Sequence, residues 1–243
     1  MAQQRVGLLL PSSNTTMETD FWRMVPEDVT VHSARMMIER VTVSALEEMS
    51  QGALRAGRLL ASAGVDVLIY GCTSGSLIKG VEWERNLAST IEEETGIPTV
   101  TTAGAVVEGL RSMGVERVGV ATPYTDDINA LERGFLEAYG FEVEEVKGLQ
   151  IVDNHEIGAV SPERIEALVD SVSGGAGGVF VSCTNLPVVP LIDELEEKIG
   201  LPVVSSNQAT LLHLSFKNSP WSSIYGRSIQ CERSVSIFSG FFS

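Results

Sequence analysis

The chain has 243 residues, of which 44% are hydrophobic and 20% charged, and its net charge at pH 7 is −15. This composition predicts a globular protein with a sizeable core and excludes an intrinsically disordered chain. The acidic balance argues against nucleic acid as a partner, because phosphate backbones bind positively charged surfaces. No apolar run reaches the roughly 18 residues that a membrane span requires.

The first part of the chain predicts strands that alternate with helices. Short apolar runs bounded by glycine or polar residues are typical of buried strands, and longer amphipathic segments are typical of helices. The strands expected here cover residues 5–10, 29–35, 67–70 and 98–101. One helix is expected to run from the turn at residues 11–16 to about residue 25. Three further helices are expected to cover residues 44–63, 82–94 and 103–113.

The second part of the chain predicts the same alternation. The strands expected here cover residues 117–121, 143–149, 179–181 and 202–204. One helix is expected to run from the turn at residues 122–127 to about residue 139. Two more are expected to cover residues 162–171 and 191–199, and residues 205–210 begin a further helix. The segment 151–158 is polar within an apolar frame and is expected to form a loop.

Matching segments in the two parts indicate an internal duplication. The pairs are residues 5–7 with 117–119 (both Arg-Val-Gly), residues 96–100 with 200–204, and Cys72 with Cys183. They occur in the same order at separations of 112, 104 and 111 residues. We therefore predict an α/β protein with two pseudo-symmetric, Rossmann-like αβα halves. Each half has three layers and a mainly parallel four-stranded sheet, and the active site lies in the cleft between the halves.

The expected domain boundaries follow the duplication. Residues 1–113 form the N-terminal half and residues 114–204 the C-terminal half, while residues 205–214 begin a closing helix that returns to the N-terminal half. Residues 215–243 differ in character, because they contain one acidic residue whereas the preceding 214 contain 31. We interpret them as an atypical tail, either a variable extension or a replaced terminus, and expect no catalytic role for Cys231.

Cys72 follows the apolar run 67–70 directly, after a single glycine. In an open parallel sheet, ligands bind outside the carboxyl ends of the strands, which is where this cysteine would stand. The alternative is that Cys72 is a small buried hydrophobic residue, the usual fate of a free cysteine. The equivalent position of Cys183 in the second half favours the first interpretation, because two facing halves would bring both thiols to one cleft.

The turn after the first strand contains Ser12, Ser13 and Asn14, directly before a predicted helix. Helix N-termini offer unpaired N–H groups that bind carboxylates, so these residues are candidate anion ligands. Simple helix capping explains one of them without any ligand. His32, His155 and His213 are scattered without metal-binding spacing and are expected to be structural.

Six segments together resemble the aspartate/glutamate racemase superfamily, and within it the maleate cis–trans isomerase and arylmalonate decarboxylase group. The segments are residues 11–15 (PSSNT), 71–75 (GCTSG), 121–124 (ATPY), 148–154 (GLQIVDN), 182–185 (SCTN) and 205–210 (SSNQAT). The resemblance covers about residues 4–214 and implies two α/β halves with the active site between them. The tail departs from the closing helix expected in this group.

The resemblance also implies roles for individual residues. Cys72 would be the nucleophile and Cys183 its acid/base partner, while Asn14, Tyr124 and Asn154 would hold the substrate carboxylates. The polar neighbours of these residues complete the expected substrate-binding set, namely Ser13, Thr73, Ser74, Thr184 and Asn185. The implied substrate is a small anionic dicarboxylate.

Two thiols suit cis–trans isomerisation of maleate without a metal or organic cofactor. A thiolate that adds to the double bond makes it single, and rotation followed by elimination gives fumarate. A two-cysteine racemase of amino acids or hydantoins, an arylmalonate-type decarboxylase and an inactive dicarboxylate-binding protein remain alternatives. The residues after each cysteine differ from the glutamate racemase pattern, and decarboxylases of this group lack the first cysteine.

The sequence also bears on the compartment, the surface and the oligomeric state of the protein. Three cysteines, an odd number, favour reduced thiols in the cytoplasm, and a strand expected within the first few residues leaves no room for a signal peptide. The acidic surface is typical either of salt adaptation or of an ordinary acidic protein. The oligomeric state is open, with a homo-oligomer as one alternative.

Overall fold

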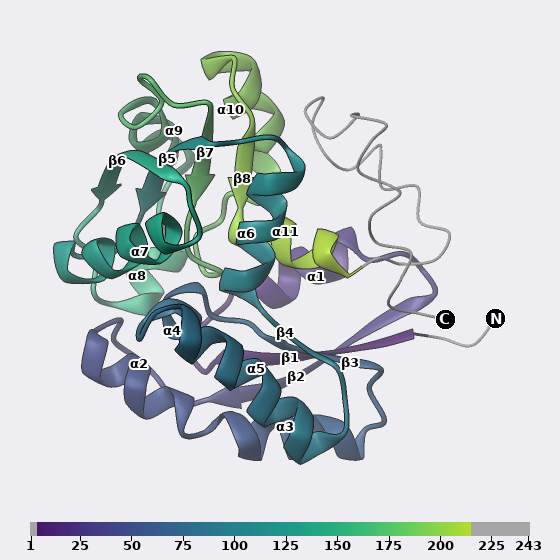
Figure 1. Ribbon diagram of the computed structural model, residues 1–243. Helices are drawn as coiled ribbons and strands as arrows, with labels where there is room; N and C mark the ends of the chain where they lie inside the picture. The colour runs from purple at the N-terminus through teal and green to yellow at the C-terminus, as the bar shows by residue number, and fades with distance from the viewer. Residues whose placement is uncertain (1–3, 215–243) are drawn as a thin grey trace.

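The computed structural model describes residues 4–214, which form two four-stranded sheets connected by helices (Figure 1). The first sheet has the strand order β2-β1-β3-β4 and the second β6-β5-β7-β8, and all neighbouring strands are parallel. The strands are β1 Gln4–Pro11, β2 Val29–Met36, β3 Val67–Tyr70, β4 Thr99–Thr101, β5 Arg117–Thr122, β6 Glu142–Gly148, β7 Gly178–Val181 and β8 Val203–Ser205. The identical strand orders confirm the predicted duplication and the α/β fold class.

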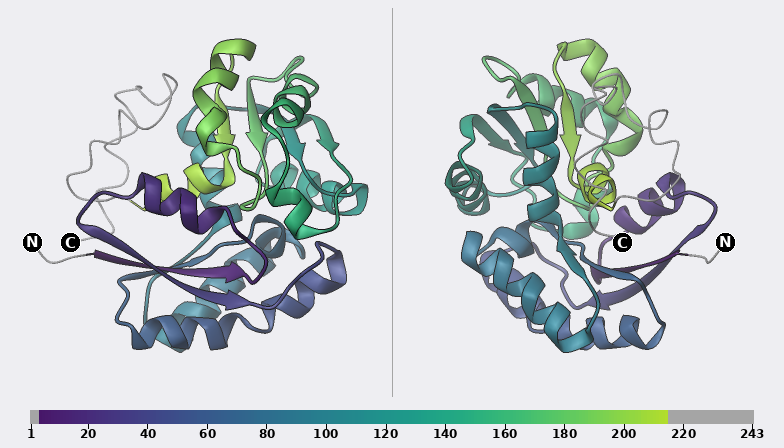
Figure 2. Two further views of the ribbon diagram at one scale, coloured as in Figure 1. Left: turned by 180° about the vertical axis from the view of Figure 1, so that it is seen from behind. Right: turned by 45° about the vertical axis from the view of Figure 1, so that its right-hand side comes forward.

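Helices cover both faces of each sheet, as the two views in Figure 2 show. In the first part of the chain they are α1 Met17–Met24, α2 Val43–Ser50, α3 Ala53–Ser62, α4 Thr73–Leu77, α5 Val81–Thr95 and α6 Thr102–Ser112. In the second part they are α7 Asp126–Ala138, α8 Asn154–Gly158, α9 Pro162–Asp170, the short 3-10 helix η1 Val189–Leu191, α10 Ile192–Ile199 and α11 Ser206–His213.

Two helices cross between the sheets. Helix α6 follows β4 of the first sheet, yet its apolar residues belong to the core cluster of the second sheet, together with Val118, Phe180 and Val204. Helix α11 follows β8 of the second sheet, yet Leu211 packs in the core cluster of the first sheet. Because of this exchange, each half contributes a helix to the core of the other. The boundary at residue 113 stays a prediction, and α6 shows that the two halves share their cores.

The exchanged helices also fix the halves to one another. Helices α6 and α11 pack closely, because a Cβ added at Gly109 would lie 3.2 Å from the Cβ of Ala209. The Asn207 amide on α11 donates a hydrogen bond of 2.7 Å to the Asp20 carboxylate on α1. Burial raises the pKa of that carboxyl to about 6, and the Asn207 hydrogen bond opposes the rise. The two sheets are therefore joined by buried contacts rather than by a linker alone.

The structure corrects three local expectations. The predicted helix 44–63 is two helices, α2 and α3, because the chain turns at Gln51 and Gly52, and glycine is a poor residue for a helix interior. The segment after Cys72, where no helix was predicted, begins the short helix α4. The segment 151–158, expected as a loop, contains α8, which Asp153 caps by accepting hydrogen bonds from two backbone N–H groups.

The repeated Arg-Val-Gly segment contains a glycine that each half needs. A Cβ at Gly7 would lie 2.9 Å from a side-chain methyl of Leu68, and a Cβ at Gly119 would lie 2.0 Å from the Val172 carbonyl oxygen. A side-chain tip can move aside, whereas the backbone carbonyl packed against β5 has far less freedom. Glycine at position 119 therefore lets the chain that precedes β7 pass directly over β5.

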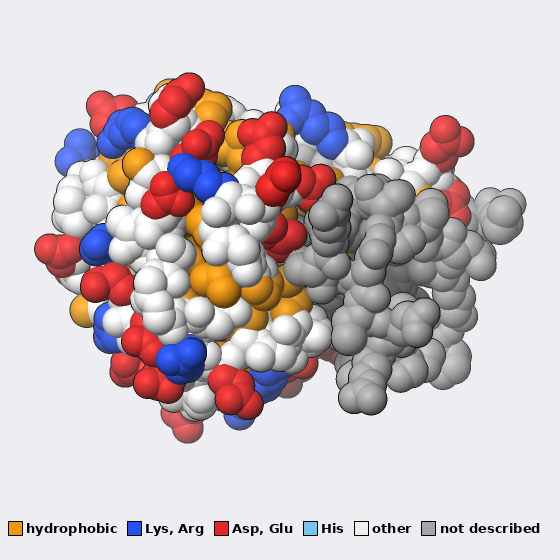
Figure 3. Space-filling model, turned by 90° about the horizontal axis from the view of Figure 1, so that it is seen from above, with side chains coloured by type: hydrophobic (Ala, Val, Ile, Leu, Met, Phe, Trp, Pro, Cys, Tyr) orange, Lys and Arg blue, Asp and Glu red, His pale blue; other side chains and the backbone are white. Residues whose placement is uncertain are grey.

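Acidic and basic side chains are interspersed over the face shown in Figure 3. Within residues 4–214, no helix combines the length and the apolar character needed to cross a membrane. Residues 215–243, where the sequence predicts an atypical tail containing Cys231, lie outside the described residues.

We predict that Gly119→Ala destabilises the protein by about 3 kcal/mol or more, because its methyl group has no space beside the Val172 carbonyl. The matched control is Gly134→Ala on the exposed side of α7, where an added Cβ meets no atom within 4 Å. That control should gain about 0.5–1 kcal/mol, since alanine favours a helix over glycine. Urea unfolding measures both, and equal stability of Gly119→Ala and the wild type would contradict the packing described here.

Candidate active site

The two cysteines stand at equivalent ends of equivalent strands. Cys72 lies two residues beyond the end of β3, and Cys183 lies two residues beyond the end of β7. Both side chains are almost fully buried, with 6% and 7% of their surface exposed. Each strand is a central strand of its parallel sheet, so both thiols occupy the edge at which such sheets bind ligands.

Hydrogen bonds tie the two cysteine loops together. The Ser206 hydroxyl oxygen accepts a bond of 2.8 Å from the Thr73 hydroxyl and one of 3.1 Å from the Cys183 N–H. The Thr184 hydroxyl donates to the Gly71 carbonyl at 3.2 Å. Thr73, Thr184 and Ser206 therefore hold the two cysteine loops in a fixed arrangement.

A small pocket lies between the loops. It is lined by Pro11, Asn14, Ile38, Val41, Leu46, Cys72, Ser74, Tyr124, Asn154, Cys183, Thr184 and Asn185. None of these lining residues is an acidic or basic side chain. The centre of a water molecule can occupy about 10 Å³ of the pocket, which is room for roughly one water molecule. A ligand larger than water therefore needs the pocket to widen.

Residues 38–41, between β2 and α2, supply the apolar side of the pocket through Ile38 and Val41. This segment is fastened to the second half of the chain by backbone hydrogen bonds. The Val41 N–H donates to the Val152 carbonyl at 2.8 Å, and the Asn154 N–H donates to the Glu39 carbonyl at 3.1 Å. Ile38 is also held by the Ser12 and Ser13 hydroxyls, so both halves of the chain position this side of the pocket.

The Cys72 sulfur accepts hydrogen bonds from its own helix start. Cys72 is the N-cap of α4, and its sulfur accepts the Gly75 N–H at 3.3 Å, while the Ser74 hydroxyl lies 3.8 Å away. Burial raises the pKa of the Cys72 thiol, and these two donors oppose the rise. A thiolate at this position is therefore costly in a dry pocket but has donors directed at it.

Cys183 has a different environment. Its backbone φ is +98°, a left-handed conformation that costs a non-glycine residue on the order of 1–3 kcal/mol. Burial raises the pKa of its thiol to about 12, although the Tyr124 hydroxyl and the Asn185 N–H form hydrogen bonds with the sulfur. Tyr124 is itself buried, and burial together with Cys183 raises its pKa well above the usual value. Both groups are neutral at pH 7.

Three asparagines form the polar wall of the pocket. The Asn14 amide donates to the Thr184 hydroxyl at 2.9 Å, and the Asn154 amide donates to the Ser13 hydroxyl at 2.8 Å. The Asn185 amide donates to the Asn154 carbonyl at 2.6 Å. Each side-chain amide carries two N–H groups, so Asn14 and Asn154 are held in place by one and keep a second for a ligand.

Of the ten residues expected at the site from the resemblance, the structure brings eight to the pocket, including both cysteines. Ser13 and Thr73 do not line the pocket, and neither does the further anion-ligand candidate Ser12, which bonds to Ile38. The Ser13 hydroxyl donates to the Ile38 carbonyl at 2.6 Å and accepts from Asn154, while the Thr73 hydroxyl donates to Ser206. This geometry supports a positioning role for both residues rather than direct ligand contact.

Metal ligation finds no support in the part of the chain that the structure describes, which contains no group of three His, Cys, Asp or Glu residues able to hold a metal ion. The scattered histidines lie outside the pocket lining. His32 contacts Thr30 at 3.0 Å, and His155 is exposed. Burial lowers the pKa of His213.

Sequence reasoning missed several residues of the site. Ser206 lies in the 205–210 segment, which stood out as the start of a helix but carried no sign that its hydroxyl joins the two cysteine loops. Ile38 and Val41 lie between elements, where no periodicity marks them. Glu132 on α7 is fully buried and accepts a 2.6 Å hydrogen bond from Ser182, the neighbour of Cys183. An acidic residue on an amphipathic helix gives no sequence signal of burial.

Several known proteins are similar to this chain in sequence or in fold. The family profile described as arylmalonate decarboxylase matches residues 6–220. The maleate isomerase of Geobacillus stearothermophilus is 32% identical over 222 residues, which cover 85% of this chain and 88% of that protein. Two solved structures are similar over most of both chains.

The first is the maleate isomerase Iso of Pseudomonas putida S16, in a variant crystallised with maleate. It has a TM-score of 0.83 and 30% identity, and the match covers 86% of this chain and 89% of that one. The second is a mutant of the Nocardia farcinica maleate cis-trans isomerase with a covalently bound succinylcysteine intermediate. It has a TM-score of 0.82 and 28% identity, and the match covers 86% and 90% of the two chains.

We predict that Glu132 makes the protein less stable as pH rises from about 4.5 to 7. Burial raises the pKa of this carboxyl from 4.5 to about 7, so the unfolded chain loses the proton before the folded protein does. The loss of stability amounts to about 3 kcal/mol at pH 8 and is absent below pH 4.5. Glu132→Gln should remove this pH dependence.

Urea unfolding at several pH values measures the difference between Glu132→Gln and the wild type. Glu137→Gln, an exposed position on the same helix, is the control and should follow the wild type within about 0.5 kcal/mol. Parallel stability curves for wild type and Glu132→Gln would contradict a buried, protonated carboxyl beside Ser182.

Proposed function

This chain belongs to the arylmalonate decarboxylase family, and we propose that within this family it is a cofactor-independent maleate cis–trans isomerase. The observation that carries the proposal is a pair of buried thiols in one uncharged pocket, at equivalent ends of the two central strands. A relative with the same fold is known with a succinylcysteine intermediate, the adduct expected when a cysteine adds to maleate.

The reaction begins with addition of the Cys72 thiolate to one alkene carbon of maleate. A carbon–sulfur bond forms, the double bond becomes single, and its electron pair moves to the second carbon and the adjacent carboxylate. The Cys183 thiol then protonates that carbon, which gives a succinyl thioether on Cys72 and leaves a thiolate on Cys183. We assign the role of nucleophile to Cys72, whose sulfur accepts from the start of α4. We assign the role of acid to Cys183, because burial raises the pKa of its thiol to about 12 and the thiol therefore holds its proton.

Rotation about the new single bond interchanges the cis and trans arrangements of the two carboxylates. After the rotation the hydrogen that the alkene carbon carried originally faces Cys183. The Cys183 thiolate removes this hydrogen as a proton, the electron pair restores the double bond, and the carbon–sulfur bond breaks. Fumarate leaves, and both thiol groups return to their starting states. The cycle involves no net oxidation or reduction, and Tyr124 stabilises the transient Cys183 thiolate through its hydrogen bond.

Neutral donors bind the carboxylates in this proposal. Asn14 and Asn154 each offer an N–H group beyond the one that positions them, and the Ser74 and Thr184 hydroxyls line the same pocket. Donors of this kind stabilise the charge that develops on the carboxylate next to the carbanion. Ser13 and Thr73 act through their neighbours, Asn154 and Ser206.

The proposed function also bears on the compartment, the partner and the oligomeric state of the protein. A thiolate nucleophile requires a reduced thiol, which fits the cytoplasm, where disulfides are rare. The net charge of −15 argues against nucleic acid as a partner, and the neutral donors of the pocket suit a small dicarboxylate. A homo-oligomer is compatible with this chemistry and is not needed for it, since both thiols come from one chain.

We predict that the purified protein converts maleate to fumarate, as followed by proton NMR in low and high salt. Cys72→Ser should lower kcat by a factor of about 10³ or more, because a neutral hydroxyl is a far weaker nucleophile than a thiolate. Cys231→Ser, which removes the third cysteine, is the control and should leave the rate unchanged.

Substantial turnover by Cys72→Ser would overturn the nucleophile assignment. An absence of fumarate from the wild type in both salts would overturn the isomerase proposal, and the alternatives then have separate readouts. Deuterium incorporation from solvent into an amino acid or hydantoin indicates a racemase, and carbon dioxide release from a disubstituted malonate indicates a decarboxylase. Thermal stabilisation by dicarboxylates without turnover indicates a binding protein.

A further inference from the structure

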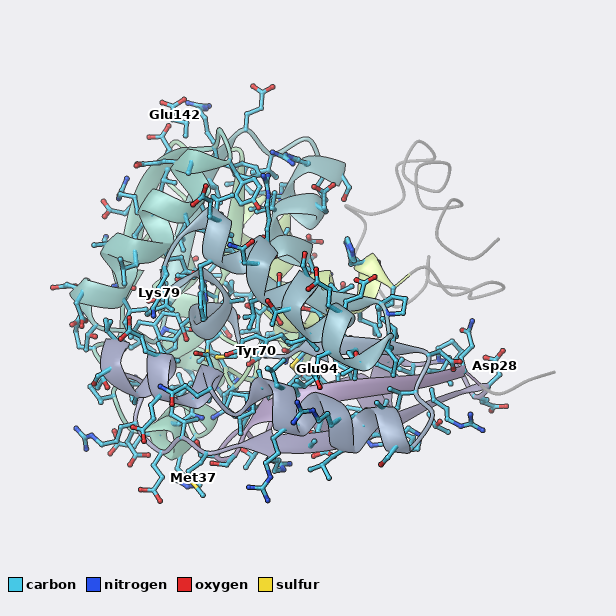
Figure 4. The ribbon with its side chains drawn as sticks, turned by 60° about the horizontal axis from the view of Figure 1, so that its bottom comes forward. Asp28, Met37, Tyr70, Lys79, Glu94 and Glu142 are labelled. Carbon is cyan, nitrogen blue, oxygen red and sulfur yellow. The ribbon has the colours of Figure 1, made fainter. Side chains whose placement is uncertain are left out.

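Tyr70 carries a buried hydroxyl that has no hydrogen-bond partner. This residue ends β3, its side chain is fully buried, and it lies in the interior while Asp28, Met37 and Glu142 project at the periphery (Figure 4). Buried tyrosine hydroxyls usually have a partner, because leaving a buried donor unpaired is unfavourable. An unpaired hydroxyl at this position therefore requires an explanation.

The Tyr70 hydroxyl and the Cys72 sulfur both lie close to Gly75. The two residues are two positions apart in extended chain, so their side chains project to the same side. A Cβ added at Gly75 would lie 2.9 Å from the Tyr70 hydroxyl oxygen and 3.1 Å from the Cys72 sulfur. Both atoms thus border the small space above Gly75, and the Met49 methyl, at 2.9 Å from the same Cβ position, borders it as well.

The Cys72 sulfur needs more donors when it carries charge than when it is a thiol. Its partners in the present state are the Gly75 N–H and the Ser74 hydroxyl, and the second is distant at 3.8 Å. The titratable groups that interact electrostatically with this sulfur are Tyr70, Tyr124 and Cys183, and none of them is a cation. A thiolate here consequently depends on neutral hydrogen bonds.

We propose that Tyr70 is a positioning residue whose hydroxyl donates a hydrogen bond to the Cys72 sulfur across the space above Gly75 when that sulfur is a thiolate. The Tyr70 hydroxyl makes no hydrogen bond when Cys72 is a thiol and makes one when Cys72 is a thiolate, so it favours ionisation of Cys72. Crowding accounts for glycine at position 75, since a methyl group there would press against the Tyr70 hydroxyl, the Cys72 sulfur and the Met49 methyl. The inference rests on the proposed role of Cys72 and adds a third donor to it.

The test measures the pKa of Cys72 without any turnover of maleate. The chain is prepared with Cys183→Ala and Cys231→Ser, so that Cys72 is its single cysteine, and its alkylation by iodoacetamide is followed by mass spectrometry from pH 6 to pH 11. Tyr70→Phe in this background should lower the alkylation rate about tenfold at fixed pH and move the profile to higher pH. A hydrogen bond to a charged group has about this effect.

Tyr139→Phe is the matched control, because this partly buried tyrosine bonds to Glu84 away from the pocket and should leave the profile unchanged. Tyr70→Phe should unfold at no lower temperature than its parent, since it removes only an unpaired hydroxyl. In the chain with both catalytic cysteines, Tyr70→Phe should lower kcat/KM for maleate near pH 7 and recover at alkaline pH.

An unchanged or lowered pKa of Cys72 in Tyr70→Phe would overturn the proposal. That result differs from a failure of the proposed function, which would appear as absence of fumarate from the wild type whatever the alkylation profile. A loss of kcat/KM that is equal at every pH would also overturn it, because a purely structural role lowers activity without moving the pH profile.

Discussion

The cost of placing negative charge on a buried sulfur is the constraint on which this site depends. Both thiols are almost fully buried, and burial raises the pKa of each. No acidic or basic side chain lines the pocket, so the protein stabilises a thiolate with oriented neutral donors alone. The same donors suit a dianionic substrate that enters and leaves, because a fixed cation beside the sulfur would also bind substrate and product tightly. The Tyr70 proposal extends this logic to a donor that acts only in the charged state.

The exchange of helices between the halves serves the same purpose. The two sulfurs belong to different sheets, so their relative position depends on how the sheets are joined. Helices α6 and α11 each pack in the core of the opposite sheet, and Ser206 at the start of α11 bonds to the loops of both cysteines. The packing of these two helices therefore fixes the distance between the two thiols. Ile38 and Val41 close the apolar side of the pocket, and backbone bonds from Glu39 and Val41 fasten this segment to the second half of the chain.

Much of this arrangement could be predicted from the sequence, for physical reasons. The duplication was visible because both halves need the same strand-to-loop geometry, and β3 was predicted with its observed bounds because four apolar residues precede a glycine. The break at Gly52 was missed because apolar spacing continues across it. The roles of Ser206, Glu132 and Tyr70 could not be predicted, since each depends on contacts between residues distant in the chain or on burial that periodicity does not report. The substrate roles of the pocket residues remain proposals.

In the proposed reaction, Cys72 forms a covalent bond with the substrate and Cys183 gives and takes the proton. The most direct test is intact-protein and peptide mass spectrometry of Cys183→Ser after incubation with maleate. This variant keeps the nucleophile and loses the thiolate that takes a proton back from the adduct. Water protonates the carbanion in place of Cys183, so a mass increase equal to one maleic acid is expected, located on the peptide that contains Cys72. The increase should be absent from the double variant Cys72→Ser and Cys183→Ser. An adduct on another residue, or none in a variant that still makes fumarate, would contradict the account.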